Sequence, residues 1–108
     1  MPYVFTTSIF PPHTTEQLAK IFVDTLKDIR SKLRGMGKEI IPNAIKSTTQ
    51  GIESISVWDI KEGKLEEFLS IDAQNMTNYH KIEGFRYTIN VRFKAIEALE
   101  MIGIKMPE

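Results

Sequence analysis

The amino-acid sequence predicts an α+β fold in which strands and helices follow the order βαββαβ, with one short helix added at the end. Two observations lead to this prediction. Apolar residues alternate in some segments and recur at spacings of three and four in others, which are the periods of strands and of amphipathic helices. Gly and Pro residues stand between these segments, where turns are expected. The chain has 108 residues, so we expect residues 1–108 to form a single domain.

The first strand is predicted at residues 3–10, which are rich in β-branched and aromatic side chains and are followed by two prolines. Thr14 and Gln17 fit a capping box, in which the Thr14 side chain accepts a hydrogen bond from the Gln17 amide, so the first helix should begin there. Gly35 is expected to stop this helix in the left-handed conformation. Residues that recur at spacings of three and four form one stripe of this helix. The stripe is almost entirely apolar: Leu18, Ile21, Phe22, Thr25, Leu26, Ile29 and Leu33.

The second and third strands are predicted at residues 40–48 and 52–60. Thr-Gln-Gly at positions 49–51 is typical of a turn, so the two strands should form a hairpin. Pro42 cannot donate a backbone hydrogen bond, and a proline in the middle of a sheet is confined to edge strands. The second strand is therefore expected at an edge of the sheet.

A second helix is predicted from residue 65 to about His80, because apolar residues again recur at helical spacing. Gly84 breaks this pattern, and residues 86–93 alternate as a fourth strand. A short helix follows at residues 94–102, and it ends at Gly103. Only Glu97 and Glu100 interrupt the apolar residues of this helix, so one packing surface could not bury all of them.

Two interlocked right-handed βαβ units give the split βαβ, or ferredoxin-like, arrangement, a four-stranded antiparallel sheet with both long helices on one face. The first and third strands would be central. The expected helix-facing side is the more apolar one: Tyr3, Phe5, Ile9, Ile45, Ile55, Val57, Tyr87, Ile89 and Val91. The expected free side carries small hydroxyls, one Trp and one amide: Val4, Thr6, Ser8, Phe10, Ala44, Ser54, Ser56, Trp58, Thr88, Asn90 and Arg92.

This semi-polar free side suggests a surface that meets something, because a face meant for water usually carries Lys and Glu. Trp58, Asn90 and Arg92 could line a ligand cavity there, together with the serines and threonines. They could equally fill an interface between two subunits, where aromatic residues and Arg are enriched.

The element order over residues 3–93 and the semi-polar free face resemble the dimeric α/β-barrel superfamily of the ferredoxin-like class, in which two subunits press their sheets together. Residues 61–67, 82–85 and 97–103 are also similar to phrases in a group of small prokaryotic proteins, a similarity that implies no activity. The first resemblance implies a homodimer. Related folds include monooxygenases and haem-degrading enzymes that use a Trp, a His and an Asn, of which Trp58 and His80 have counterparts here, whereas the first strand offers Thr and Ser in place of the Asn.

Composition narrows the choice of partners. Fourteen basic residues balance fourteen acidic residues, so the chain lacks the positive field on which most nucleic-acid and anionic-membrane binding relies. The third strand also lacks the paired aromatic residues of RNA-recognition domains. There is no apolar run long enough for a membrane span and no secretory signal pattern, so we expect a cytoplasmic protein.

Asp72 is the most unusual candidate residue, because it lies within the apolar stripe of the second helix, four residues from both Phe68 and Met76. Burying a carboxylate is costly unless something compensates for it. Asp72 could therefore be a general base or a ligand-orienting group in a cleft between helix and sheet, near Tyr79, His80, Tyr87 or Asn43. The alternative is a hydrogen-bonded carboxylate at a partly wet edge.

Other catalytic chemistries find little support in the sequence. His80 lies near the end of the second helix, where an imidazolium would interact favourably with the helix terminus. The chain has no Cys and no His pair at helical spacing, so we expect no metal site and no cofactor. No serine lies in a nucleophile elbow, and no glycine-rich phosphate loop is present.

Three functions follow as hypotheses. The first is a homodimer or higher homo-oligomer that binds a small organic ligand in a helix–sheet or barrel cavity. The second is a non-catalytic assembly or regulatory module. The third is a cofactor-independent enzyme similar to the monooxygenases named above. The residues that we expect at a ligand site are Trp58, Asp72, Tyr79, His80, Tyr87, Asn90 and Arg92.

Overall fold

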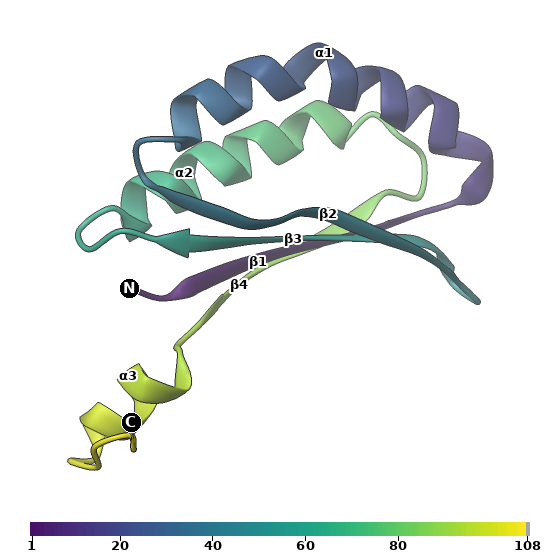
Figure 1. Cartoon of the computed structure of the whole chain (residues 1–108). Coiled ribbons are helices and arrows are strands. Elements are labelled where there is room, and N and C mark those ends of the chain that lie inside the picture. The colour runs from purple at the N-terminus through teal and green to yellow at the C-terminus, as the bar shows by residue number, and fades with distance from the viewer. Residues whose placement is uncertain (108) are drawn as a thin grey trace.

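A computed structural model of the chain describes residues 1–107 and has the expected order of elements (Figure 1). The strands are β1 (Tyr3–Phe10), β2 (Gly37–Thr48), β3 (Gly51–Ile60) and β4 (Arg86–Arg92). The α-helices are α1 (Thr15–Leu33), α2 (Leu65–Met76) and α3 (Ala95–Met101), and single 3-10 turns at Pro12–Thr14 and Thr77–Tyr79 precede α1 and follow α2. The strands and helices thus lie where the sequence predicts them, within a few residues.

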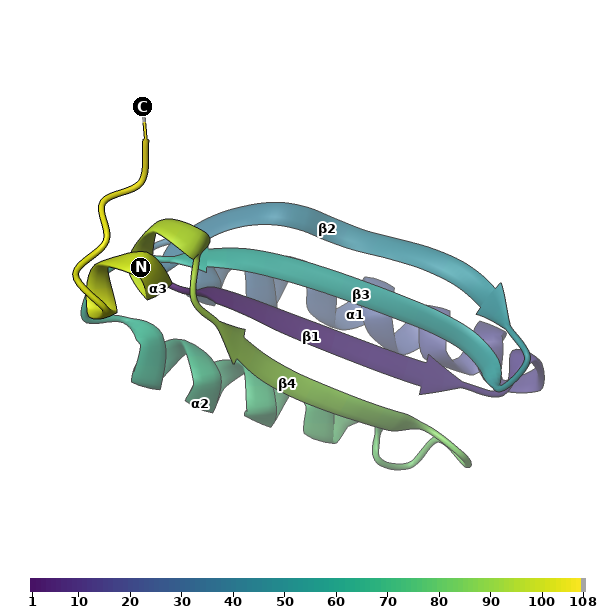
Figure 2. The same cartoon turned by 90° about the horizontal axis from the view of Figure 1, so that it is seen from below.

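The four strands form one antiparallel sheet in the order β2-β3-β1-β4 (Figure 2). This arrangement is α+β and compatible with the ferredoxin-like fold. The strand β2 that contains Pro42 lies at an edge, which confirms that prediction, and the pairing of β2 with β3 is irregular between Ile41 and Ala44, around the proline.

The helices lie on opposite sides of the sheet. Both α1 and α2 cover one face, whereas α3 follows β4 and projects away from the other side (Figure 1). Seen from below, the strands have no helix layer over their second face (Figure 2). We call the face under α1 and α2 the covered face and the other one the open face.

The expected assignment of the two faces is wrong for β1 and β3. Register pairs Val4 with Trp58 and with Val91, and the side chains of Val4 and Trp58 belong to the core beneath the helices. Thr6 also reaches α2, since its hydroxyl donates a hydrogen bond to Asp72. The covered face therefore carries the hydroxyl set of β1 and β3, together with Tyr87 and Ile89 of β4, as expected for that strand.

The apolar set of β1 and β3 lies instead on the open face. Tyr3 and Phe5 pair with Arg92 and Asn90 of β4, and the Arg92 guanidinium lies 4.8 Å from the centre of the Phe5 ring. The prediction assumed that the more apolar side of a strand must face the helices. That rule fails here because the centre of the covered face borders a cavity, where hydroxyl side chains of β1 and β3 form one wall.

Two apolar clusters hold the helices on the covered face. One contains Val4, Trp58, Ile60 and Phe68, with the Trp58 and Phe68 rings 5.5 Å apart. The other lies toward the opposite end of α2 and contains three buried residues, Met76, Tyr79 and Ile82. The β-strand side chains between the two clusters are small and polar, so the space between sheet and helices is less filled there than at the two clusters.

Two local predictions are wrong. Thr14 makes no capping bond to the helix, because its hydroxyl donates to the Pro11 carbonyl within the 3-10 turn that leads into α1. Gly35, expected to end α1 in the left-handed conformation, does not adopt a positive φ. Gly103, expected at the end of the last helix, does adopt one, at 77°.

No helix among residues 1–107 is long and apolar enough to cross a membrane. The cytoplasmic location stays a prediction.

Candidate functional site

A cavity of about 100 Å³ lies between the covered face of the sheet and the two long helices. Its wall includes residues of β1, β2, β3, α1 and α2. The residues that line it are Thr6, Ser8, Leu18, Phe22, Thr25, Leu26, Ile29, Arg30, Leu33, Glu39, Pro42, Asn43, Ser54, Ser56, Trp58, Asp72, Asn75, Met76, Tyr79 and Phe85.

The floor of the cavity is a patch of hydroxyl groups on the two central strands. Thr6 lies opposite Ser56 in the register of β1 and β3, and Ser8 lies opposite Ser54. All four line the cavity. Hydroxyl side chains are smaller than the Leu, Ile or Phe that usually fill such central positions, so space is left beneath the helices and each hydroxyl can donate or accept a hydrogen bond there.

The opposite wall is largely apolar and comes from α1. Leu18, Phe22, Leu26 and Ile29 recur at helical spacing, and all four are half-buried. The stripe that the sequence predicts as a packing face therefore exists, but it faces a cavity in addition to the core. The resulting space has hydroxyls on one side and hydrocarbon on the other.

Asp72 supplies a carboxylate at this cavity. It lies on α2 and is only 7% exposed, as its place within the apolar stripe predicts. The Thr6 hydroxyl donates a hydrogen bond of 2.6 Å to Asp72 Oδ2. Burial raises the pKa of the Asp72 carboxyl above its ordinary value of 3.8, and the Thr6 hydrogen bond opposes that rise because it favours the ionised form.

A second buried titratable group, Tyr79, lines the cavity from the 3-10 turn that follows α2. It is 6% exposed, and its ring stacks on Phe85 with the centroids 5.2 Å apart. Burial raises the pKa of the Tyr79 hydroxyl, so the phenol is neutral across the physiological range. Asp72 and Tyr79, both expected at a ligand site, do lie on the same cavity.

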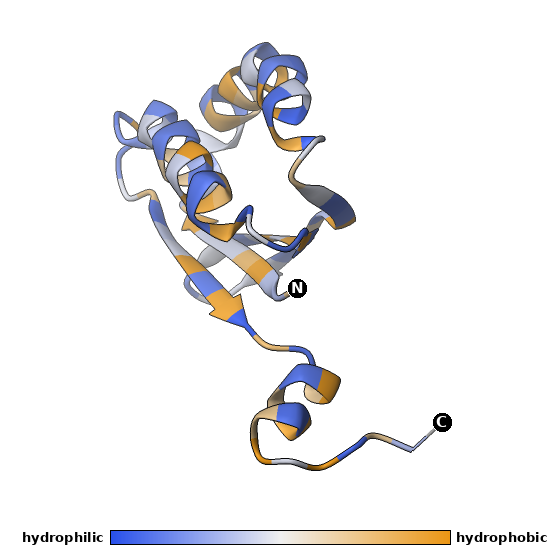
Figure 3. Ribbon diagram, turned by 90° about the vertical axis from the view of Figure 1, so that its left-hand side faces the viewer, coloured by the Kyte–Doolittle hydropathy of each residue, from blue (hydrophilic) through white to orange (hydrophobic). Residues whose placement is uncertain are grey.

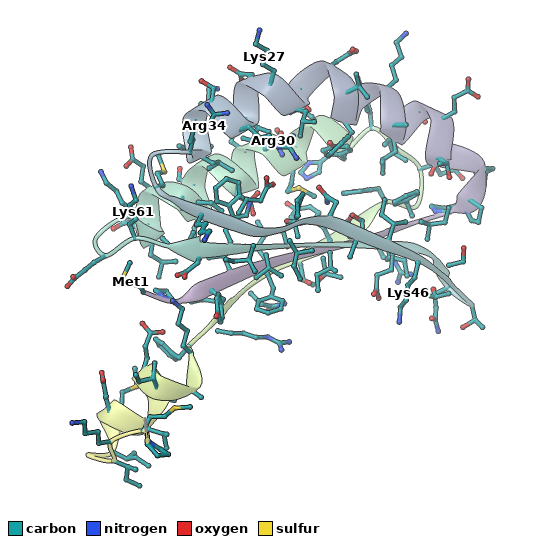
Figure 4. The ribbon with its side chains drawn as sticks, viewed as in Figure 1. Met1, Lys27, Arg30, Arg34, Lys46 and Lys61 are labelled. Atoms are coloured by element: carbon teal, nitrogen blue, oxygen red, sulfur yellow. The ribbon has the colours of Figure 1, made fainter. Side chains whose placement is uncertain are left out.

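A charged pair borders the cavity on the side of β2. Arg30 of α1 lies with its Nε 3.5 Å from Glu39 Oε1, and that nitrogen is buried without a hydrogen bond. Figure 4 shows Arg30 between α1 and the sheet, whereas Lys27 on the same helix points away. Asn43, also of β2, donates a hydrogen bond of 3.0 Å to Ser54 Oγ and so ties the edge strand to the cavity floor.

The prediction did not include Arg30 or Glu39. Arg30 carried a signal, because it lies four residues after Leu26 and three before Leu33, within the apolar stripe of the first helix. A charged residue in such a stripe indicates a candidate site residue, as Asp72 does in the second helix. Glu39 carried none, since it precedes the predicted start of its strand.

Of the other expected residues, Trp58 also lines the cavity, and the remaining four lie elsewhere. His80 and Tyr87 stack on each other outside the cavity, with ring centroids 5.8 Å apart. Asn90 and Arg92 project from the open face of β4, on the other side of the sheet from Asp72. Trp58 lines the cavity but lies in the first apolar cluster, so the structure does not bring Trp58 and His80 together.

The described residues contain no group of three or more His, Cys, Asp or Glu side chains that could hold a metal ion. Known proteins add no further constraint, because no protein family model, no curated protein and no solved structure matches this chain. The chemistry of the site must therefore be inferred from the cavity itself.

Proposed function

We propose that this protein binds a small organic molecule in the cavity between the covered face and the helices. The observation that carries the proposal is the pairing of a buried carboxylate and a hydroxyl floor with an apolar wall around one space. Ligand sites typically combine an apolar lining with a few convergent polar groups. Structural packing alone has no need for such a combination, because a buried carboxylate destabilises a fold unless something compensates for it.

The volume limits the size of the ligand. An engineered apolar cavity of about 150 Å³ binds benzene, so a space of about 100 Å³ suits a molecule of similar size or smaller. Haem and nucleotides are much larger than this. The geometry therefore favours simple ligand binding over the monooxygenase-like alternative, since Trp58 and His80 also lie apart.

A cavity-filling variant tests the proposal. Ser56→Val places a larger, branched side chain in the cavity floor, and the control Thr88→Val introduces the same residue on the open side of β4, away from the cavity. We expect a panel of small fragments, screened by ligand-observed NMR, to include binders of the wild type and of Thr88→Val that do not bind Ser56→Val. Absence of any wild-type binder, or equal binding by both variants, would contradict the proposal.

The second candidate is self-association, and a different observation favours it. The register places the half-buried Tyr3, Phe5, Ile9 and Ile55 on the open face, which has no helix layer over it (Figure 2). Large apolar residues are exposed in α3 and directly after it, among them Ile96, Met101 and Ile102. A helix of seven residues is marginal on its own in water, and apolar patches of this kind are typical of interaction sites.

We infer that a second copy of the chain covers this surface, as in the dimeric α/β-barrel arrangement. Because the net charge of the chain is zero, two copies do not repel each other through their overall charge. Figure 3 shows α3 apart from the rest of the domain, with hydrophobic residues along it. On this proposal the protein is a homodimer in which each copy carries its own cavity, and an assembly role requires no ligand. Sedimentation of the full chain as a monomer at high concentration would overturn it.

A further inference from the structure

The carboxylate in the cavity has no cationic partner. Five ion pairs occur among residues 1–107, and none involves Asp72. Arg30 is the one Lys or Arg side chain that lines the cavity, and it pairs with Glu39. The lining therefore holds one positive group against two carboxyl groups, so with both carboxylates ionised the cavity carries one uncompensated negative charge.

We propose that the ligand is a small primary amine, whose ammonium group supplies the missing cation beside Asp72 and whose hydrocarbon part lies against α1. This inference rests on the proposed ligand-binding function. It follows from three features of the cavity: an uncompensated carboxylate, acceptor oxygens next to it, and an apolar wall.

The hydrogen-bonding capacity of the site matches an ammonium group. An ammonium has three donors and no acceptor. Thr6 donates its hydrogen bond to Asp72 Oδ2. Asp72 Oδ1 accepts no hydrogen bond from residues 1–107 and is therefore available to a ligand. The Ser8 and Ser56 hydroxyls beside Thr6 add two further acceptor oxygens on the floor. A carboxylic acid would instead face Asp72 with a like charge.

The size and polarity of the remaining space select against other cations. Leu18, Phe22 and Leu26 offer hydrocarbon surface, which suits a short alkyl or ring group and gives nothing to a hydrated metal ion. A single carboxylate and neutral hydroxyls also fall short of the oxygen cage that Ca²⁺ or Mg²⁺ requires. The volume of about 100 Å³, against about 150 Å³ for a cavity that binds benzene, suits a ligand with no more heavy atoms than benzene.

The proposal has a pH signature. The titratable or charged groups that face the cavity are Asp72 of α2, Arg30 of α1, Glu39 of β2 and Tyr79 after α2. Burial raises the pKa of Asp72, so a rising pH ionises this group and should strengthen amine binding. Affinity should fall again only where the amine itself loses its proton, near a pKa of about 10.4 for an alkylamine.

Calorimetric titration of the full chain with n-butylamine, n-butanol and butyrate tests the inference. These probes share a chain length and differ in charge. We expect n-butylamine to bind the wild type most tightly. Asp72→Asn should weaken it by about 30-fold or more, because a buried charged group loses its partner, while n-butanol is affected little. The matched control is Glu66→Gln, which removes an exposed carboxylate from the same helix and should change nothing.

The outcomes separate the two proposals. Equal binding of amine and alcohol, or amine binding that survives Asp72→Asn, overturns the amine inference and leaves a small-molecule site. Binding of none of the three probes, together with failure of the fragment screen, overturns both. If Asp72→Asn does not fold, a titration of the wild type tests the amine inference instead. The carbon-13 signal of the Asp72 carboxyl should titrate at lower pH when n-butylamine is present, and an unchanged titration contradicts the inference.

Discussion

The covered and open faces of the sheet are made from opposite sets of side chains. Beneath α1 and α2 the central strands place Thr6, Ser8, Ser54 and Ser56, whereas the open face places Tyr3, Phe5 and other apolar residues where no helix packs. A monomer built only for stability would have the reverse arrangement, because burial of apolar surface is the main stabilising term. The difference underlies the two proposals, in which the covered face binds a small molecule and the open face binds a second copy of the chain.

The largest expected effect on stability concerns the apolar cluster of Val4, Trp58, Ile60 and Phe68 on the covered face. Phe68 is 1% exposed and packs on Trp58, so Phe68→Ala should lower the free energy of unfolding by about 3–5 kcal/mol. Ser56→Ala, a similarly placed change at the cavity floor, should cost far less because no packed volume is lost. Urea denaturation measures both variants. Equal losses would contradict the distinction between a packed end and a cavity.

On the open face, Phe5→Lys should weaken self-association by about 30-fold or more, because it places a charge in the surface that we propose as the contact. Sedimentation velocity over a range of concentrations measures the effect. Val23→Lys is the matched control, since Val23 is 70% exposed on α1 and lies away from the sheet. A dimer that tolerates Phe5→Lys, or one that Val23→Lys disrupts, would place the interface elsewhere.

At the cavity, Asp72→Asn should raise the stability of the ligand-free protein by about 1–2 kcal/mol at pH 8, because the variant no longer buries a carboxylate. Burial raises the pKa of Asp72 in the folded state above its unfolded value. Asp72 therefore contributes stability that is complete below the unfolded pKa and is lost as the pH rises through the folded pKa.

The advantage of Asp72→Asn should accordingly vanish near pH 3 and grow as the pH rises. Thermal unfolding of both proteins across this range, without amine in the buffer, gives the comparison. A variant that is less stable at pH 8 would mean that the carboxylate has a structural partner. Glu66→Gln again provides the control, because it removes an exposed carboxylate from the same helix.

The smallest expected effect concerns the edge of the covered face. Asn43→Ala removes the hydrogen bond to Ser54 and should cost about 1 kcal/mol. Hydrogen exchange at the β2 amides should increase in this variant, since Asn43 ties the irregular edge strand to the cavity floor. Unchanged exchange would indicate that the backbone pairing of β2 with β3 holds this edge alone.

Sequence periodicity predicts the elements well and the faces poorly. The order of elements and the edge position of Pro42 follow from local rules about turns, prolines and helical spacing. The face of a strand depends instead on what lies over it. In β1 both alternating sets contain apolar residues, so only the register with Trp58 and Val91 decides which set meets the helices.

The candidate site was predictable to the extent that a residue broke a pattern. Asp72 interrupts an apolar stripe, and the structure places it at the cavity as expected. Arg30 interrupts the stripe of α1 in the same way. His80 and Arg92 break no pattern, and they lie outside the cavity. Glu39 reaches the cavity only through the pairing of β2 with β3, a non-local feature that no spacing along the chain encodes.

The central claim, that the covered face holds a small-molecule site at Asp72, is tested most directly by mapping a bound probe. Nitrogen-15 correlation spectra of the wild type, recorded during titration with n-butylamine, report which backbone amides sense the ligand. We expect saturable shifts centred on Thr6, Ser56 and Asp72, which surround the cavity from both sides. Shifts confined to the open face around Phe5, or no saturable shifts at all, would contradict the claim.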